Sequence, residues 1–127
     1  MILWAETNSL FSCATIQTTI SDSNSEVVDQ IESSEFRTVK YLIQVSSVSN
    51  GFQSTELLLN HNSTVINTME YGSISTASKL VVPSAYFVNS LIFLKLARTS
   101  NELVLDVIIN RLAIRRSNIS PATKLVN

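Results

Sequence analysis

The chain has 127 residues, of which 45% are hydrophobic and 15% charged, and its formal net charge is -1. A domain of this length can bury enough apolar surface to offset the entropy lost on folding, which excludes an intrinsically disordered chain. The near-neutral charge argues against a nucleic-acid partner, and the abundance of Val, Ile, Ser and Thr favours strands over helices.

Residues 1–35 form an acidic segment, because they hold six acidic side chains and none of the nine Lys and Arg residues. This asymmetry fits contact with a basic region of a neighbouring copy, but solvated surface or pairing within the chain explains it more simply. The apolar start lacks the basic flank and the length of a signal peptide or membrane span, so we expect Trp4 to dock on the sheet or on another subunit. Residues 15–20 are predicted as a strand. Residues 26–31 fit a strand or a short helix, and we favour the strand.

Residues 36–74 predict a meander of three antiparallel strands, around which the rest of the chain is organised. The first strand has apolar residues two positions apart, the spacing of side chains on one face of a strand: Val39, Tyr41, Ile43 and Val45. The pair Asn50-Gly51 tolerates the positive φ angles of a hairpin turn, and residues 61–63 supply a second polar turn.

After the meander the sequence predicts three more strands and a tail. Residues 79–88 contain Pro83, which lacks the amide donor of a central strand, so this run is predicted as an edge strand, a strand end or a bulge. Residues 91–114 are predicted as a hairpin whose second strand turns four residues inward: Leu103, Leu105, Val107 and Ile109. The outward side of that strand also carries large apolar residues, so we expect a second layer or another subunit to cover it: Val104, Ile108 and Leu112.

Three runs carry a resemblance to a known family: FRTVKYLIQV at residues 36–45, ELLLNHNST at residues 56–64 and EYGSI at residues 70–74. They resemble a β-rich module in virion structural proteins of contractile-tailed bacteriophages, especially those that infect marine cyanobacteria. The similarity continues to Ile114 and contains no catalytic motif. Residues 78–88 depart from the family pattern, because Leu80, Pro83 and Tyr86 stand in a run where acidic and small residues are usual.

The sequence offers few candidates for chemistry. His61, the single histidine, is predicted as a surface turn residue, and Cys13 as a small buried apolar residue. Glu56 and Glu70 could approach each other as an acid and base pair, but we favour solvated positions or pairing with Lys40. Four aromatic residues fit either a sugar-binding platform or, as we favour, core and interface packing: Tyr71, Tyr86, Phe87 and Phe93.

We therefore predict an all-β fold, an antiparallel β-sandwich of about eight strands in a single domain. It would consist of the acidic segment at residues 1–35, a sandwich core at residues 36–114 and a basic C-terminal arm at residues 115–127. The predicted interface residues are Trp4, Tyr86 and Phe87 as buried contacts, and Arg115 and Arg116 as contacts of the arm.

The resemblance implies a non-enzymatic structural protein of a tailed-phage virion, assembled in the host cytoplasm, that decorates the capsid or forms part of the tail. Its partners would be copies of itself and other virion proteins, and we expect no cofactor, metal, nucleic acid or membrane. The alternative is a β-sandwich module of a phage tail that binds a host glycan or receptor, which rests on analogy of fold.

Overall fold

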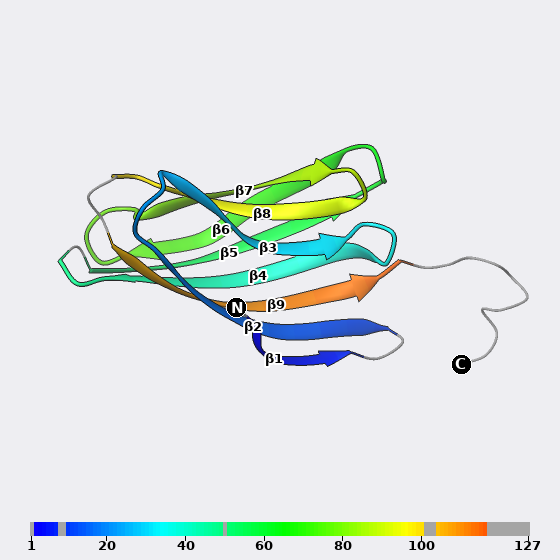
Figure 1. The fold of residues 1–127 in the computed structure, drawn as a ribbon, viewed down its shortest axis with the longest axis horizontal. Coiled ribbons are helices and arrows are strands. Elements are labelled where there is room, and N and C mark those ends of the chain that lie inside the picture. Colours follow the sequence, from blue (N-terminus) through cyan, green and yellow to red (C-terminus); the bar gives the residue numbers. More distant parts are fainter. Residues whose placement is uncertain (1, 8–9, 50, 101–103, 117–127) are drawn as a thin grey trace, which may run out of the picture.

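Nine β-strands and no helix make up the part of the chain that the computed structural model describes, residues 2–7, 10–49, 51–100 and 104–116. The strands are β1 (Ile2–Thr7), β2 (Phe11–Ile20), β3 (Ser25–Glu32), β4 (Phe36–Ser47), β5 (Gly51–His61), β6 (Ile66–Ser75), β7 (Val81–Val88), β8 (Leu91–Arg98) and β9 (Leu105–Arg115). Six of them form one sheet in the order β1-β2-β9-β4-β5-β6, and three form a second sheet in the order β3-β8-β7. The sheets are antiparallel and lie in two layers (Figure 1), which confirms the predicted all-β sandwich.

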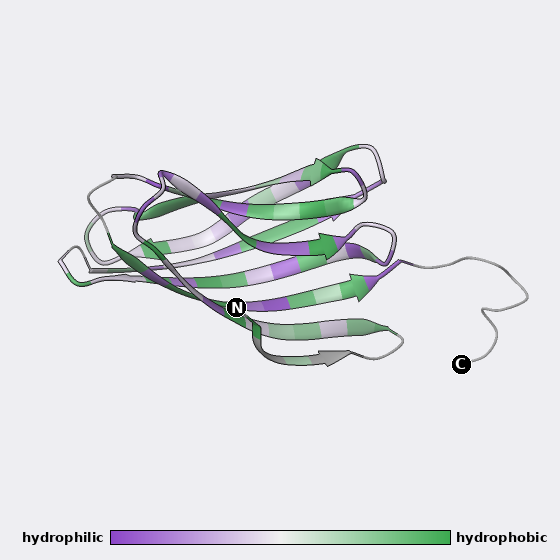
Figure 2. Cartoon of the chain, in the orientation of Figure 1, coloured by the Kyte–Doolittle hydropathy of each residue, from purple (hydrophilic) through white to green (hydrophobic). Residues whose placement is uncertain are grey.

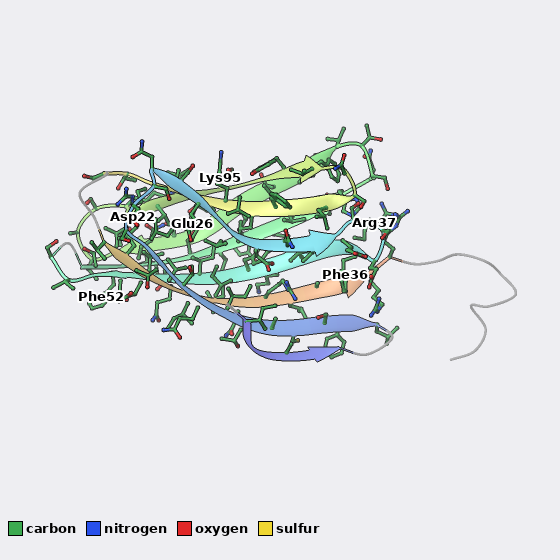
Figure 3. The ribbon with its side chains drawn as sticks, in the orientation of Figure 1. Asp22, Glu26, Phe36, Arg37, Phe52 and Lys95 are labelled. Carbon is green, nitrogen blue, oxygen red and sulfur yellow. The ribbon has the colours of Figure 1, made fainter. Side chains whose placement is uncertain are left out.

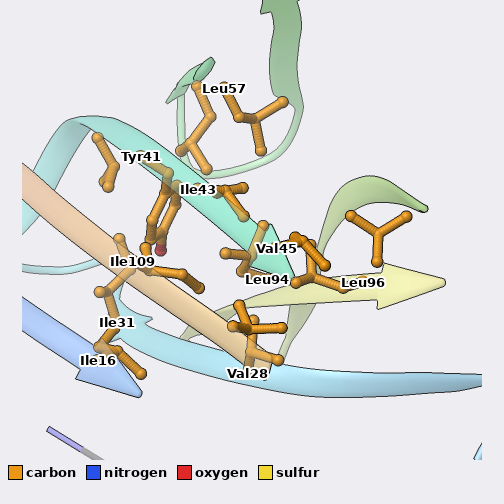
Figure 4. Packing of buried hydrophobic residues seen from close by; sticks show 14 of the residues in the cluster. Ile16, Val28, Ile31, Tyr41, Ile43, Val45, Leu57, Leu94, Leu96 and Ile109 are labelled. Atoms are coloured by element: carbon orange, nitrogen blue, oxygen red, sulfur yellow. The ribbon is translucent and has the colours of Figure 1, made fainter. Parts of the chain in front are cut away.

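The hydrophobic core lies between the sheets and follows from alternation along the central strands. In β4 the predicted inward residues are all fully buried: Val39, Tyr41, Ile43 and Val45. The buried side of β8 faces them with Leu94 and Leu96 (Figure 4), and Ile92 of the same side belongs to the same cluster. Burial alternates along β4 and β9, but hydropathy does so only in part, and Figure 2 shows hydrophobic and hydrophilic stretches along both strands. Each fully buried aliphatic side chain contributes roughly 1.5–3 kcal/mol relative to an exposed one.

The meander and two other strand predictions are confirmed. Strands β4, β5 and β6 are neighbours in one sheet, β3 is a strand, and β7, which contains Pro83, lies at the edge of the smaller sheet. Gly51 has a φ of +90°, and a Cβ there would lie 2.1 Å from Thr76 Oγ1. Because Thr76 Oγ1 also accepts a 2.9 Å hydrogen bond from the Phe52 amide, the turn between β4 and β5 requires glycine.

The predicted hairpin at residues 91–114 is wrong. Strand β8 belongs to the three-stranded sheet, whereas β9 crosses to the larger sheet and pairs with β2 on one side and β4 on the other. Three of the four residues predicted to point inward from this strand, Leu105, Val107 and Ile109, are fully buried, and Leu103 lies outside the described residues. Alternation fixes which side of a strand is buried, but it does not specify the neighbouring strand, and the two apolar strands contribute to the same core from different sheets.

His61 is also not the surface turn residue that the sequence predicts. It is the last residue of β5 and is only 3% exposed. Its Nε2 is hydrogen-bonded to the Phe36 carbonyl oxygen, its Nδ1 accepts a 2.9 Å bond from the Ser63 amide, and its ring meets Phe87 edge to face at 5.8 Å. The imidazole thus satisfies backbone groups of two chain segments and fills space at the end of the core.

A buried charged network joins the two sheets. A bulge in β3 leaves Val28 without a partner, so the consecutive residues Val28 and Asp29 both point inward. Arg111 Nη1 donates to both carboxylate oxygens of Asp29, at 2.9 and 3.0 Å, and the Tyr41 hydroxyl donates to Asp29 Oδ2 at 2.7 Å. The two charged side chains are only 4% and 9% exposed. Burial first, and then the Asp29 carboxylate, raises the pKa of Tyr41 well above its usual value.

Replacing Asp29 by alanine should destabilise the fold strongly, because it leaves the Arg111 guanidinium buried without its countercharge. We expect the free energy of unfolding, measured by urea denaturation, to fall by about 3–5 kcal/mol. The matched control is Glu35→Ala, which removes the more exposed Glu35–Arg115 pair and should shift the urea midpoint far less. Equal shifts for the two variants would show that the buried network does not hold the sheets together.

Stability should also fall at alkaline pH because of Tyr41. Its folded-state pKa is raised, so its contribution to stability is complete below the ordinary tyrosine pKa of about 10 and is lost above it, as the unfolded chain releases the proton that the folded chain retains. Urea denaturation at several pH values should show this decline in the wild type. Tyr41→Phe should flatten it, and an unchanged slope would remove Tyr41 as the cause.

Candidate functional site

The outer side of the three-stranded sheet gathers side chains of several chemical kinds. We call this surface the aromatic face and define it by six outward residues of β3, β7 and β8: Val27, Gln30, Ser84, Tyr86, Phe93 and Lys95. The register places them in two adjacent rows across the sheet, because Gln30 and Tyr86 both lie opposite Phe93, and Val27 and Ser84 both lie opposite Lys95.

Two aromatic rings and a cation form the centre of the aromatic face. The Tyr86 and Phe93 rings meet at a centroid distance of 5.7 Å and an angle of 68°, and Lys95 Nζ lies 5.4 Å from the centre of the Tyr86 ring. Tyr86 keeps 37% of its surface exposed. Figure 3 labels Lys95 on this sheet. Neighbouring rings and the ammonium group restrict the Tyr86 side chain, so a ligand that contacts it would meet a largely preset surface.

The predicted aromatic platform does not form as one unit. Strand alternation separates the adjacent residues Tyr86 and Phe87: Tyr86 points outward, whereas Phe87 points inward and packs against the core beside His61. Tyr71 lies opposite Glu56 on the outer side of the larger sheet. Tyr86 and Phe93 therefore share a surface, and a partner contact at Tyr86 or Phe87 stays a prediction.

The two arginines predicted as arm contacts are held by their own chain. Arg115 ends β9, donates a 3.1 Å hydrogen bond to Glu35 Oε1, and lies 5.1 Å from the centre of the Phe36 ring. Arg116 donates its amide to the Glu35 carbonyl oxygen at 2.8 Å and its Nη1 to the Ser33 carbonyl oxygen at 3.3 Å. A hydrogen bond with Glu32, followed by Arg115, lowers the pKa of Glu35.

These contacts favour the simpler explanation of the charge asymmetry, pairing within the chain. Asp29 and Glu35 of the acidic segment bind Arg111 and Arg115, respectively. The remainder of the predicted arm, residues 117–127, lies outside the described residues. Trp4 lies opposite Thr15 in the β1-β2 pair, but its side chain is outside the described part, so its contact stays a prediction.

The two glutamates do not form an acid and base pair. Glu56 points to the outer side of the larger sheet and binds Lys40 at 3.0 Å, as favoured from the sequence. Glu70 is on the opposite side of that sheet, where it accepts a 2.7 Å bond from the inward hydroxyl of Thr55 and binds Lys79 at 2.8 Å. Within the described ranges, no three His, Cys, Asp or Glu side chains gather into a metal-binding group, and no helix could span a membrane.

Comparison with known proteins identifies the fold but not a sequence family. No family model and no curated protein matches this sequence. The structure is similar to the tailspike protein of Acinetobacter baumannii phage AM24, with a TM-score of 0.51 and 10% identity over 85% of this chain and 27% of the tailspike.

Two further tailspikes match less well. One is gp49 of Acinetobacter baumannii bacteriophage Fri1, a capsular polysaccharide depolymerase, with a TM-score of 0.44 and 13% identity over 80% of this chain and 17% of gp49. The other is the tailspike of Acinetobacter phage vB_ApiP_P1, with a TM-score of 0.44 and 9% identity over 82% of this chain and 22% of that protein. In the better match, to the AM24 tailspike, this chain spans about a quarter of the length of the tailspike.

The comparison confirms part of the expected resemblance. The chain has the fold of a segment of a phage tailspike. The narrower likeness to virion proteins of contractile-tailed phages of cyanobacteria stays a prediction.

Proposed function

We propose that this chain is a β-sandwich module of a bacteriophage tail and that it binds polysaccharide on the host cell surface. The observation that carries the proposal is the similarity to the AM24 tailspike, which extends over 85% of this chain. This similarity supports the alternative drawn from the sequence over capsid decoration, because the matched protein is a component of the tail. Since a fold hosts many functions, the choice of ligand has to come from the surface itself.

The aromatic face has the chemistry that a sugar requires. A pyranose ring presents C–H groups on its flat sides, which pack on aromatic rings such as Tyr86, and hydroxyl groups around its edge, which need donors and acceptors. Gln30 and Ser84 are exposed beside the rings and supply an amide and a hydroxyl, and Lys95 supplies a cation for an acidic sugar. These groups lie on paired strands, and such rigid elements position a binding surface better than loops do.

The proposal is one of binding without catalysis, as expected from the sequence. The arrangement of Glu56 and Glu70 supports it, because each carboxylate binds a lysine and the two are on opposite sides of the sheet. The activity of any longer protein that contains this module is a separate question, since the chain corresponds to only 27% of the AM24 tailspike.

Binding can be tested with oligosaccharide fragments prepared from the capsules of a panel of Acinetobacter baumannii strains. Isothermal titration of the purified chain should detect binding of at least one fragment. Tyr86→Ala should weaken this binding about 5- to 30-fold, since loss of one stacking ring corresponds to roughly 1–2 kcal/mol.

The control variant is Tyr71→Ala, which removes a partly exposed tyrosine from the opposite outer surface and should leave the affinity unchanged. Short fragments are used because each occupies one site, so the result does not depend on the number of associated chains. Absence of binding across the panel would contradict the proposed function. Equal losses of affinity in the two variants would show that the fragment binds outside the aromatic face.

A further inference from the structure

The outer side of the six-stranded sheet exposes far more apolar surface than a solvated strand face normally shows. We call it the broad face. Eight large apolar side chains on β4, β5, β6 and β9 point outward there and remain 37–69% exposed: Leu42, Phe52, Leu58, Met69, Ile74, Ile108, Leu112 and Ile114. The sequence anticipates part of this surface, because Ile108 and Leu112 were expected to need a cover. Polar residues such as Gln44 and Asn110 lie between the apolar ones, but so many exposed large apolar side chains on one side of a sheet are typical of an interaction surface.

The broad face is almost neutral. Among its described side chains only Lys40, Glu56 and Asp106 are charged. Lys40 and Glu56 neutralise each other at 3.0 Å, and Asp106 accepts a 3.1 Å hydrogen bond from the Thr19 hydroxyl. A charged ligand would find no opposite field here, whereas a second copy of the same surface would meet little repulsion.

The broad face also combines projections with hollows. One hollow of about 370 Å³ is bordered by Lys40, Leu42 and Leu112, and a second of about 150 Å³ is bordered by Leu42, Gln44 and Ile108. Asn110 borders both hollows and accepts a 3.0 Å bond from the Thr15 hydroxyl. A two-fold interface needs projections and matching recesses on the same surface, because each contact occurs twice with the roles exchanged.

The size of the broad face suits a stable dimer. Six strands about 4.8 Å apart and roughly eight residues long cover about 700–800 Å², close to the ~800 Å² that each partner buries in an interface of standard size. From its area, its nearly neutral charge and its two hollows, we propose that the broad face binds the broad face of a second copy of this chain about a two-fold axis.

Dimerisation leaves the proposed glycan site free. The aromatic face lies on the opposite outer side of the sandwich, so the dimer presents two such faces pointing away from each other. The inference rests on the six-stranded sheet alone and does not depend on the ligand of the aromatic face.

Sedimentation equilibrium of the purified chain tests the proposal. From low micromolar to several hundred micromolar, the weight-average mass should rise towards about 28 kDa, twice the 14.0 kDa of one chain. Leu42→Glu places a carboxylate between the two hollows. It should raise the dissociation constant of the dimer at least about 30-fold, which corresponds to the loss of ~2 kcal/mol expected for a central contact.

Val82→Glu is a closely matched control. Val82 and Leu42 are both 47% exposed on the outer side of a strand, but Val82 belongs to the three-stranded sheet, so its variant should dimerise like the wild type. Circular dichroism checks that each variant is folded. If Leu42→Glu fails to fold, the milder Ile108→Gln replaces it and should also weaken the dimer.

Three outcomes would overturn the inference. A wild-type mass of 14.0 kDa at every concentration would show that another partner or solvent covers the broad face. Equal dimerisation of folded broad-face variants and wild type, or equal loss in Val82→Glu and Leu42→Glu, would place the contact elsewhere. None of these outcomes bears on oligosaccharide binding by the aromatic face.

Discussion

Strand β9 is the element on which the rest of the sandwich depends, because β2 and β4 do not pair with each other and are joined only through it. Its inward residues Leu105, Val107 and Ile109 are fully buried. Both of its edges carry a long antiparallel ladder, and the one with β4 is irregular only between Phe36 and Thr38. The larger sheet is therefore complete only when this late strand has inserted between two early ones. Such distant pairings carry a high entropy cost of loop closure, which the apolar burial has to offset.

The same strand fixes the position of the second sheet. Arg111 of β9 reaches across the core to Asp29 of β3, and Tyr41 of β4 completes the hydrogen bonding of that carboxylate. A buried ion pair contributes little net stability against an apolar alternative, but it strongly penalises any packing that separates the charges. Elsewhere, the Gln53 side chain of β5 is hydrogen-bonded to the amide and carbonyl of Val81 at the start of β7. The Thr18 hydroxyl of β2 donates to Glu26 of β3, so polar contacts join the sheets at further places.

The sequence predicted well whatever depends on local periodicity. The buried residues of β4 and β9, the turn at Gly51 and the edge position of Pro83 all follow from two-residue alternation or from the backbone limits of one residue type. Two predictions were wrong, the hairpin of β8 with β9 and the surface position of His61. Both concern contacts between segments that lie far apart in the sequence. The orientation of Asp29 depends on a single extra residue in β3, and nothing in the residue types around Val28 indicates that bulge.

For the candidate site, alternation alone could have separated Tyr86 from Phe87. The approach of Phe93 and Lys95 to Tyr86 could not be predicted, because it depends on the register of β7 on β8.

The contrast between the two outer faces follows from the unequal sheets. A six-stranded sheet that covers a three-stranded one has apolar residues on both sides of its central strands, and only the inner side is satisfied within the chain. The outer side of the smaller sheet instead carries the aromatic rings of Tyr86 and Phe93 and the ammonium group of Lys95. These groups suit a polar ligand that binds reversibly. A single sugar site of this size binds weakly, because few groups contact the ligand. Because the two aromatic faces of the proposed dimer point away from each other, each would bind a separate length of polysaccharide, and the dimer would gain no avidity for a single flat surface. The two proposals are physically compatible, because association through the broad face leaves the aromatic face of each chain uncovered.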